Sequence, residues 1–236
     1  MKTIFHPAKE RGHADHGWLN AWHSFSFAGW YDPSKVHFGM LRVLNDDTVA
    51  PGMGFGMHPH DNMEIVTIPL EGVLEHKDNM GSHGVIRRNE VQVMSAGTGV
   101  YHSEFNHSKS EPVKLFQCWV FPREKGVTPR YDQKLFDPAG RKNKFQTLVA
   151  PDKGGENLWL HQDTVFSMAD MDEGKSLEYK INFKGNGAYI MLVEGEVEID
   201  GRKLGKRDAI GVWETDRFDI KALKNSEVLV IEVPMN

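Results

Sequence analysis

Short hydrophobic runs separated by turn residues recur along the whole chain, and helical periodicity is nearly absent. The runs are four to eight residues long, rich in Val, Ile, Phe and Trp, and end at Gly, Asn, Asp or Pro. This pattern predicts many short β-strands, which are typical of antiparallel sandwiches and barrels. The predicted strands form two series, residues 22–27, 40–44, 64–70, 91–94 and 114–121, then 176–183, 189–193, 197–200, 209–213 and 227–233.

A polar segment, residues 122–145, separates the two series and contains three prolines. Because proline cannot donate the hydrogen bond that a sheet ladder needs, we expect a connector here rather than a sheet strand. We therefore predict an N-terminal domain of residues 1–135 and a C-terminal domain of residues 136–236.

The two series also resemble each other in sequence. Residues 70–75 (LEGVLE) align with residues 193–198 (VEGEVE) at an offset of 123, and residues 89–94 align with residues 207–212 at an offset of 118. Two matches in the same order indicate an internal duplication of one unit. Together with the strand pattern, they predict an all-β fold made of two antiparallel β-barrels.

Composition and charge exclude several classes of protein. The chain has 236 residues, a net charge of −5 and no run of eighteen apolar residues. These values argue against nucleic acid as a direct partner and against a membrane-spanning helix. Cys118 is the only cysteine, so intrachain disulfides and thiolate zinc fingers are excluded. With no signal-peptide pattern at the N-terminus, we predict a location in the cytoplasm.

Histidines concentrate in the first half, where eleven of the twelve lie within the first 107 residues. In an extended chain His58 and His60 project from one face, and so do His102 and Glu104. Two antiparallel strands can therefore bring three imidazoles and one carboxylate to one point. Such ligands suit one divalent ion, Fe(II), Mn(II), Ni(II), Cu(II) or Zn(II), and leave two octahedral positions open for a substrate and O2.

The internal repeat predicts that the second unit lacks this site. The residues that the two offsets place opposite the candidate ligands are apolar: Ile181, Phe183, Ile220 and Ala222. We therefore expect no metal in the second barrel. Three further histidines follow predicted strand ends or turns and are expected to be exposed: His76, His83 and His107.

Longer motifs around these residues resemble known families. Residues 52–64 (GMGFGMHPHDNME) resemble the first cupin motif, and residues 99–106 (GVYHSEFN) resemble the second. More narrowly, five segments resemble the pirin family: residues 11–19, 22–27, 58–64, 94–104 and 128–131.

The resemblance implies a bicupin, in which two cupin-type barrels face one another and the N-terminal barrel holds one mononuclear metal, usually iron. The family's ligands map to His58, His60, His102 and Glu104. Pirin-like proteins are associated with quercetin 2,3-dioxygenase activity, and animal members with transcriptional co-regulation.

The carboxylate ligand could come from either of two glutamates. In many cupins it comes from the first motif, which here is Glu64, and strand parity alone allows Glu64 to point inward. The pirin pattern instead favours Glu104. Glu64 would then lie beside the metal, and both Glu64 and Glu104 are candidates for the catalytic base.

Two functional hypotheses follow. The first is a metal-dependent dioxygenase that cleaves a flavonol such as quercetin, or a similar enol-bearing aromatic, after the substrate hydroxyl loses its proton and binds the metal. The alternative is a non-enzymatic metal-binding protein that senses redox state or co-regulates transcription through a protein partner. Oxygen uptake with quercetin separates the two hypotheses.

Overall fold

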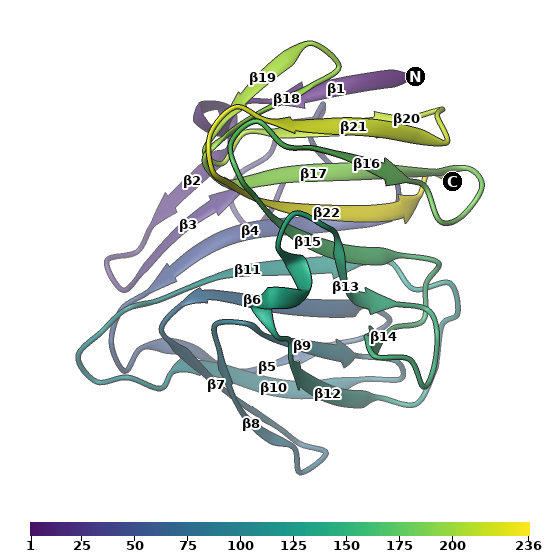
Figure 1. Cartoon of the computed structure of the whole chain (residues 1–236). Coiled ribbons are helices and arrows are strands. Elements are labelled where there is room, and N and C mark those ends of the chain that lie inside the picture. Colours follow the sequence, from purple (N-terminus) through teal and green to yellow (C-terminus); the bar gives the residue numbers. More distant parts are fainter.

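The computed structural model describes residues 1–236, which form twenty-two β-strands and two short 3₁₀ helices (Figure 1). The strands belong to two seven-stranded and two four-stranded sheets. No helix combines the length and the hydrophobicity that crossing a bilayer requires. The predicted all-β fold class is confirmed.

The first half of the chain contains one sheet of each size. Its elements are η1 (Ala8–Glu10), β2 (Gly12–Asp15), β3 (Leu19–His23), β4 (Leu41–Val49), β5 (Gly54–His60), β6 (Glu64–Glu71), β7 (Val73–Asp78), β8 (His83–Arg87), β9 (Glu90–Ser95), β10 (Val100–Asn106), β11 (Val113–Val120) and β12 (Arg130–Leu135). The seven-stranded sheet has the order β12-β9-β6-β11-β4-β3-β2, and the four-stranded sheet has the order β5-β10-β7-β8.

The second half repeats this arrangement. Its elements are β1 (Lys2–His6), η2 (Pro138–Arg141), β13 (Gln146–Ala150), β14 (Leu158–Trp159), β15 (Val165–Met171), β16 (Ser176–Lys180), β17 (Asn186–Glu194), β18 (Glu196–Ile199), β19 (Arg202–Gly205), β20 (Ala209–Trp213), β21 (Arg217–Ala222) and β22 (Ser226–Pro234). The sheets run β1-β20-β17-β22-β15-β13-β14 and β16-β21-β18-β19. The two halves therefore share the order of the inner strands, β9-β6-β11-β4 and β20-β17-β22-β15, and of the four-stranded sheets, as an internal duplication predicts. The outer strands differ, since β13 pairs with β14 in parallel whereas β3 pairs with β2 antiparallel.

Strand β1 departs from the predicted division of the chain. It pairs with β20, from Lys2 opposite Trp213 to His6 opposite Ala209, and so lies in the sheet of the second half. β1 covers the outer edge of β20, and β12 covers the corresponding edge of β9 in the first half. Without such a partner, a strand edge exposes its backbone hydrogen-bonding groups. Residues 2–6 thus join the C-terminal half, and a boundary after residue 135 stays a prediction for the rest of the chain.

Residues 130–135 form a strand where the sequence predicted a connector. β12 pairs with β9, from Arg130 opposite Ser95 to Leu135 opposite Glu90. The connector prediction was wrong here because β12 is an edge strand whose side chains are all at least partly exposed. An edge strand with solvent-exposed side chains tolerates a polar composition that a central strand would not.

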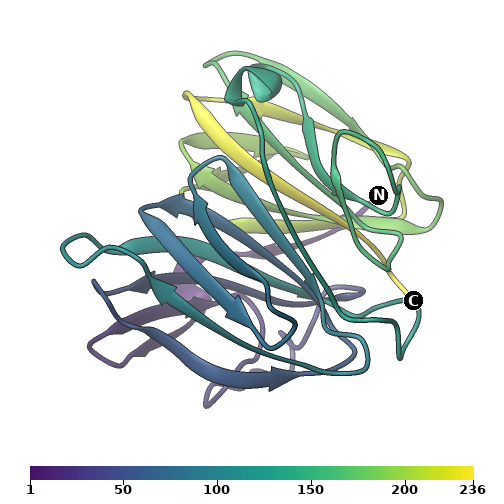
Figure 2. The same ribbon diagram turned by 90° about the horizontal axis from the view of Figure 1, so that it is seen from below.

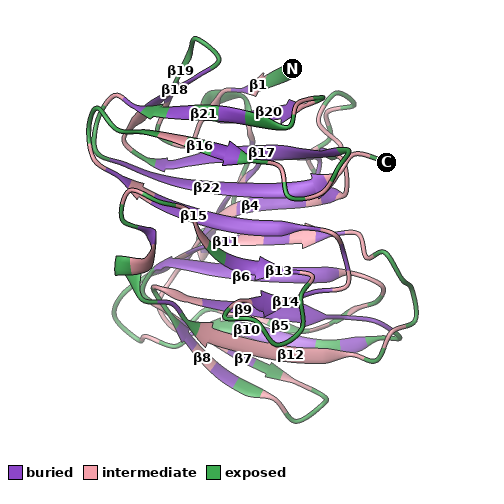
Figure 3. Cartoon of the chain, turned by 45° about the vertical axis from the view of Figure 1, so that its right-hand side comes forward, coloured by how far each residue is buried: buried purple, intermediate pink, exposed green.

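The two seven-stranded sheets pack against each other. The sheets of the two halves face each other (Figure 2), and a cluster of 26 buried residues draws side chains from both halves. The strands at the centre of the molecule are accordingly the most buried (Figure 3). From β6 the side chains of Val66, Ile68 and Leu70 enter this cluster, whereas Thr67 contacts Glu104 of β10 inside the first barrel. β6 is therefore buried on both faces.

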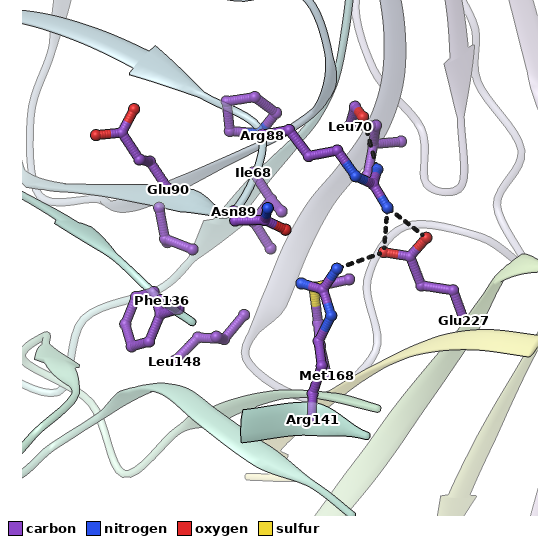
Figure 4. Close-up of a pocket in the computed structure, with 12 residues that line it drawn as sticks. Ile68, Leu70, Arg88, Asn89, Glu90, Phe136, Arg141, Leu148, Met168 and Glu227 are labelled. Carbon is purple, nitrogen blue, oxygen red and sulfur yellow. Dashed lines mark hydrogen bonds and ion pairs between the residues drawn. The ribbon is translucent and has the colours of Figure 1, made fainter. Parts of the chain in front are cut away.

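Ion pairs also join the halves. Glu227 of β22 accepts a hydrogen bond from Arg88 of the first half at 3.0 Å and, within the second half, pairs with Arg141 of η2 at 3.6 Å (Figure 4). The Nε atom of Arg207 lies 2.8 Å from Oδ2 of Asp46 on β4. Because these groups, apart from Arg88, are largely shielded from water, their attraction is screened less than that of surface pairs.

Candidate metal centre

Strands β5 and β10 bring three histidines together. His58 lies opposite His102 in the antiparallel pairing, and His60 lies opposite Val100. The ring of His102 is 4.4 Å from that of His58 and 4.9 Å from that of His60, measured between centroids. One nitrogen from each ring lies within 4.8 Å of the other two. The structure thus brings His102 of β10 together with His58 and His60, which alternation placed on one face of β5.

The cluster favours neutral imidazoles, which is the form that binds a metal ion. Burial, together with the neighbouring His102 and His58, lowers the pKa of His60 to about 4. Burial also lowers the pKa of His102 to about 3, with His58 and His76 acting in the same direction. At neutral pH His60 and His102 therefore each offer a lone pair.

The orientation of the rings fits a metal ion. The Nδ1 atom of His58 donates to the carbonyl oxygen of Gly56 at 2.7 Å, which leaves Nε2 of His58 unprotonated. The Nε2 atom of His102 is buried and has no hydrogen-bond partner in the protein. A buried polar atom without a partner is costly, and an ion shared by the three rings would satisfy it.

Glu104 approaches the same region from the side of β10. Its carboxylate is 3% exposed and accepts hydrogen bonds from Gln92 at 2.9 Å, Gln117 at 2.7 Å and Thr67 at 3.3 Å. Glu104 and His102 form a second group of possible ligands with His76, which shares His102 with the three-histidine group. Coordination of the same ion by Glu104 stays a prediction.

A cavity of about 230 Å³ opens beside the histidines. Its walls include three aromatic side chains, and its polar lining comes from the candidate ligands and from three residues of β4 and β11. The lining residues are Phe27, Phe55, Trp119, Asn45, Asp47, Gln117, His58, His60, His102 and Glu104. Sequence reasoning missed the polar residues of β4, although two aspartates and an asparagine directly after the predicted strand of residues 40–44 were a signal.

Glu64 does not join the cluster. Its carboxylate accepts a hydrogen bond from the hydroxyl of Ser95 at 2.7 Å and lies 3.2 Å from Nδ1 of His161 in the second half. Alternation along β6 puts Glu64 on the same face as Val66, which packs against the other barrel. We therefore do not retain Glu64 as a metal ligand or a base for this site.

One of the three histidines that were expected to be exposed is instead buried. His76 is fully buried and stacks on Tyr131, with ring centroids 4.4 Å apart. His83 and His107 are exposed and contact Glu75. The prediction failed for His76 because β7 continues through it to Asp78, so that its side chain enters the barrel.

The second half has apolar or aromatic residues at the corresponding positions. Leu74 pairs with Asn106 in the first half as Val197 pairs with Ala222 in the second. With this alignment, the counterparts of the four candidate ligands are Tyr179, Ile181, Phe218 and Ile220. They differ by two residues from those that the sequence offsets gave, because the loops between the strands differ in length by two residues.

Comparison with known proteins identifies the family. Residues 4–120 match the family model described as Pirin, and residues 147–233 match the one described as Quercetinase C-terminal cupin domain. A quercetin 2,3-dioxygenase of Escherichia coli (strain K12) is 43% identical over 228 residues, which cover 96% of each protein. The chain belongs to the pirin family. A pirin-like protein of Caulobacter vibrioides is 37% identical over 96% of this pirin and 97% of its own length.

Solved structures agree with this assignment. The crystal structure of YhhW from Escherichia coli superposes on this pirin with a TM-score of 0.94 and 41% identity, covering 99% of this chain and 98% of that one. A structure of bacterial pirin YhhW in complex with nickel(II), also from Escherichia coli, has a TM-score of 0.93 and 40% identity over 99% of each chain. The predicted bicupin fold is confirmed.

Proposed function

We propose that this pirin is a metal-dependent dioxygenase that cleaves a flavonol such as quercetin, or a similar enol-bearing aromatic, with O2. The observation that carries the proposal is the buried, unpartnered Nε2 atom of His102 within a cluster of three histidines beside a cavity. The similarity to proteins named quercetin 2,3-dioxygenase over nearly the whole chain supports the same reaction.

The residues that would hold the ion are His58, His60, His102 and Glu104. Three nitrogens and one oxygen suit several divalent ions, of which we propose Fe(II). An ion in this place supplies a Lewis acid and a template for the substrate oxygen and O2. The donors Gln92 and Gln117 orient the Glu104 carboxylate through the hydrogen bonds described above.

The cavity suits a flat aromatic substrate. Phe27, Phe55 and Trp119 provide apolar walls, and Asn45 and Gln117 provide neutral polar groups that can fix its orientation. A cavity of roughly 150 Å³ is sufficient for benzene, so about 230 Å³ accommodates a larger ring system.

The test measures metal content and oxygen uptake together. Protein purified without added metal is analysed for its elements, stripped with a chelator and reloaded with Fe(II), Mn(II), Ni(II), Cu(II) or Zn(II). We expect uptake of O2 with quercetin and none with the matching flavone that lacks the 3-hydroxyl group. Lack of uptake with every ion would refute the proposal.

The proposal also covers the partners and the compartment of the protein. The partners are the small aromatic substrate and O2. The compartment we propose is the cytoplasm, where a single unpaired cysteine such as the buried Cys118 stays reduced.

A further inference from the structure

The cavity contains one carboxyl group outside the set of candidate ligands. Asp47 lies on β4, where it pairs with Leu115 of β11 and Ala21 of β3. Its neighbour Asp46 points the other way, toward Arg207 of the second half. Because alternate residues of a strand face opposite sides, Asp47 points into the first barrel, where it lines the cavity with the three histidines.

The carboxyl group of Asp47 has no partner that would explain its burial. Its residue is 4% exposed, and its Oδ1 atom is fully buried without a hydrogen bond. Burial, together with the charges of Asp46 and Glu104, raises the pKa of Asp47 to about 8. A desolvated, unpaired carboxyl group destabilises a fold, so packing alone does not account for this residue.

The two other carboxylates near the cavity are less suited to accepting a proton from a substrate. Both oxygens of Glu104 already accept hydrogen bonds, from Gln92 and from Gln117. Glu64 lies on the other face of β6, against His161. Of these three carboxyl groups, that of Asp47 alone combines a place in the cavity wall with an oxygen that has no partner.

We propose that Asp47 is the catalytic base that removes the proton from the enol hydroxyl group of the substrate. The inference rests on the proposed dioxygenase function. In this step the substrate O–H bond breaks, the proton binds a carboxylate oxygen of Asp47, and the electron pair stays on the substrate oxygen. No atom is oxidised or reduced in this step. The resulting oxyanion is the form that a Lewis acid stabilises.

The other ionisable groups facing the cavity are His58, His60 and His102, and Glu104 on β10. On β4, Asp46 faces the opposite side. On β11 and β3 the residues paired with Asp47 are apolar. A proton released in the cavity can therefore bind Asp47 or one of these few other groups. Asp47→Asn removes the carboxylate of residue 47 and keeps the size of the side chain.

The experiment compares wild-type protein with Asp47→Asn, Asp47→Glu and the neighbouring control Asp46→Asn, each with its metal content measured. Anaerobic binding of quercetin is followed by the absorbance of its ionised form, and turnover by oxygen uptake. For Asp47→Asn we expect bound quercetin to stay un-ionised, turnover to fall by roughly 10²–10⁴-fold and metal content to be unchanged. Asp47→Glu is expected to restore part of the turnover, and Asp46→Asn to keep the spectral change.

The outcomes separate the two proposals. An active wild type with an equally active Asp47→Asn variant, or with fully ionised quercetin bound to that variant, overturns the role of Asp47 only. Loss of the metal from Asp47→Asn overturns it as well, in favour of a role in metal binding. A wild type that neither binds quercetin nor takes up O2 overturns the proposed function and this inference together.

Discussion

The Nδ1 atom of His76 lies 3.4 Å from the Nδ1 atom of His102, and both rings are buried. The Nε2 atom of His76 lies 3.2 Å from Oδ2 of Asp78. Because a carboxylate can only accept, His76 carries its proton on Nε2 and offers Nδ1 as an acceptor to His102. His102 is then protonated on Nδ1, and its unprotonated Nε2 atom is the one without a protein partner.

The first prediction concerns this chain of hydrogen bonds. His76→Phe keeps the stack on Tyr131 but removes the acceptor for His102. Since hydrogen bonds to ligating histidines fix their tautomer, we expect metal affinity to fall by roughly 10–100-fold. Titration with a chelator and the absorption spectrum of the Co(II)-loaded protein measure the effect. The matched control is His83→Phe, at an exposed histidine of β8, and equal affinities in both variants would contradict the prediction.

The second prediction concerns the ligands themselves. His58→Ala or His102→Ala removes one of three ring nitrogens, and we expect the purified variants to contain no bound ion. The fold is expected to persist, because the main core cluster lies between the sheets and includes neither residue. Elemental analysis and circular dichroism measure the two properties. His107→Ala, at an exposed histidine, should retain wild-type metal content, and metal retained by His58→Ala or His102→Ala would refute the site.

The third prediction concerns the pH dependence of stability in the metal-free protein. The pKa of Asp47 is raised to about 8 in the folded state, against about 3.9 in an unfolded chain. Between these values the folded state binds more protons, so the free energy of unfolding falls as the pH rises. Asp47→Asn lacks this titration. Its free energy of unfolding, relative to that of the wild type, should therefore rise from pH 4 to pH 8. Urea unfolding measures it, and a difference that is independent of pH would be inconsistent with the buried, unpaired carboxyl group.

The fourth prediction concerns the contact between the barrels. Glu227→Ala removes the carboxylate that pairs with Arg88 of the first half and with Arg141, whose ion pair with Asp170 at 2.9 Å remains, and we expect a loss of about 2 kcal/mol in the free energy of unfolding. Glu214→Ala breaks the exposed pair with Lys2 and should cost less than about 1 kcal/mol. Chemical denaturation measures both variants. Equal losses would show that burial of the pair between the sheets does not matter.

Part of the site could be predicted from the sequence because strand geometry is local. Side chains of a strand alternate with a period of two, so His58 and His60 share a face in any extended structure. The same holds for His102 and Glu104, which are both buried while Tyr101 and Phe105 beside them are exposed. The strand spacing and the internal repeat likewise indicated two similar β units.

The direction of Glu64 could not be predicted in this way. Alternation identifies which residues share a face, but it indicates the inner face only where the other face is polar. β6 is buried on both faces, because its second face packs against the other barrel, and apolar residues therefore occur on both faces of the strand. Only the packing of the two sheets decided that Glu64 contacts His161.

The sequence by itself determined the β class of the chain, the repetition of its strand pattern and the shared face of His58 and His60, because these depend on neighbours along the chain. The tertiary structure decided which residues from distant strands meet: Asp47 and His76 lie 11 and 16 residues from the nearest histidine of β5. Both reach the site because β4 pairs with β11 and β7 pairs with β10. Strand pairing depends on the whole sheet, and the positions of the buried groups beside the metal centre therefore depend on it too.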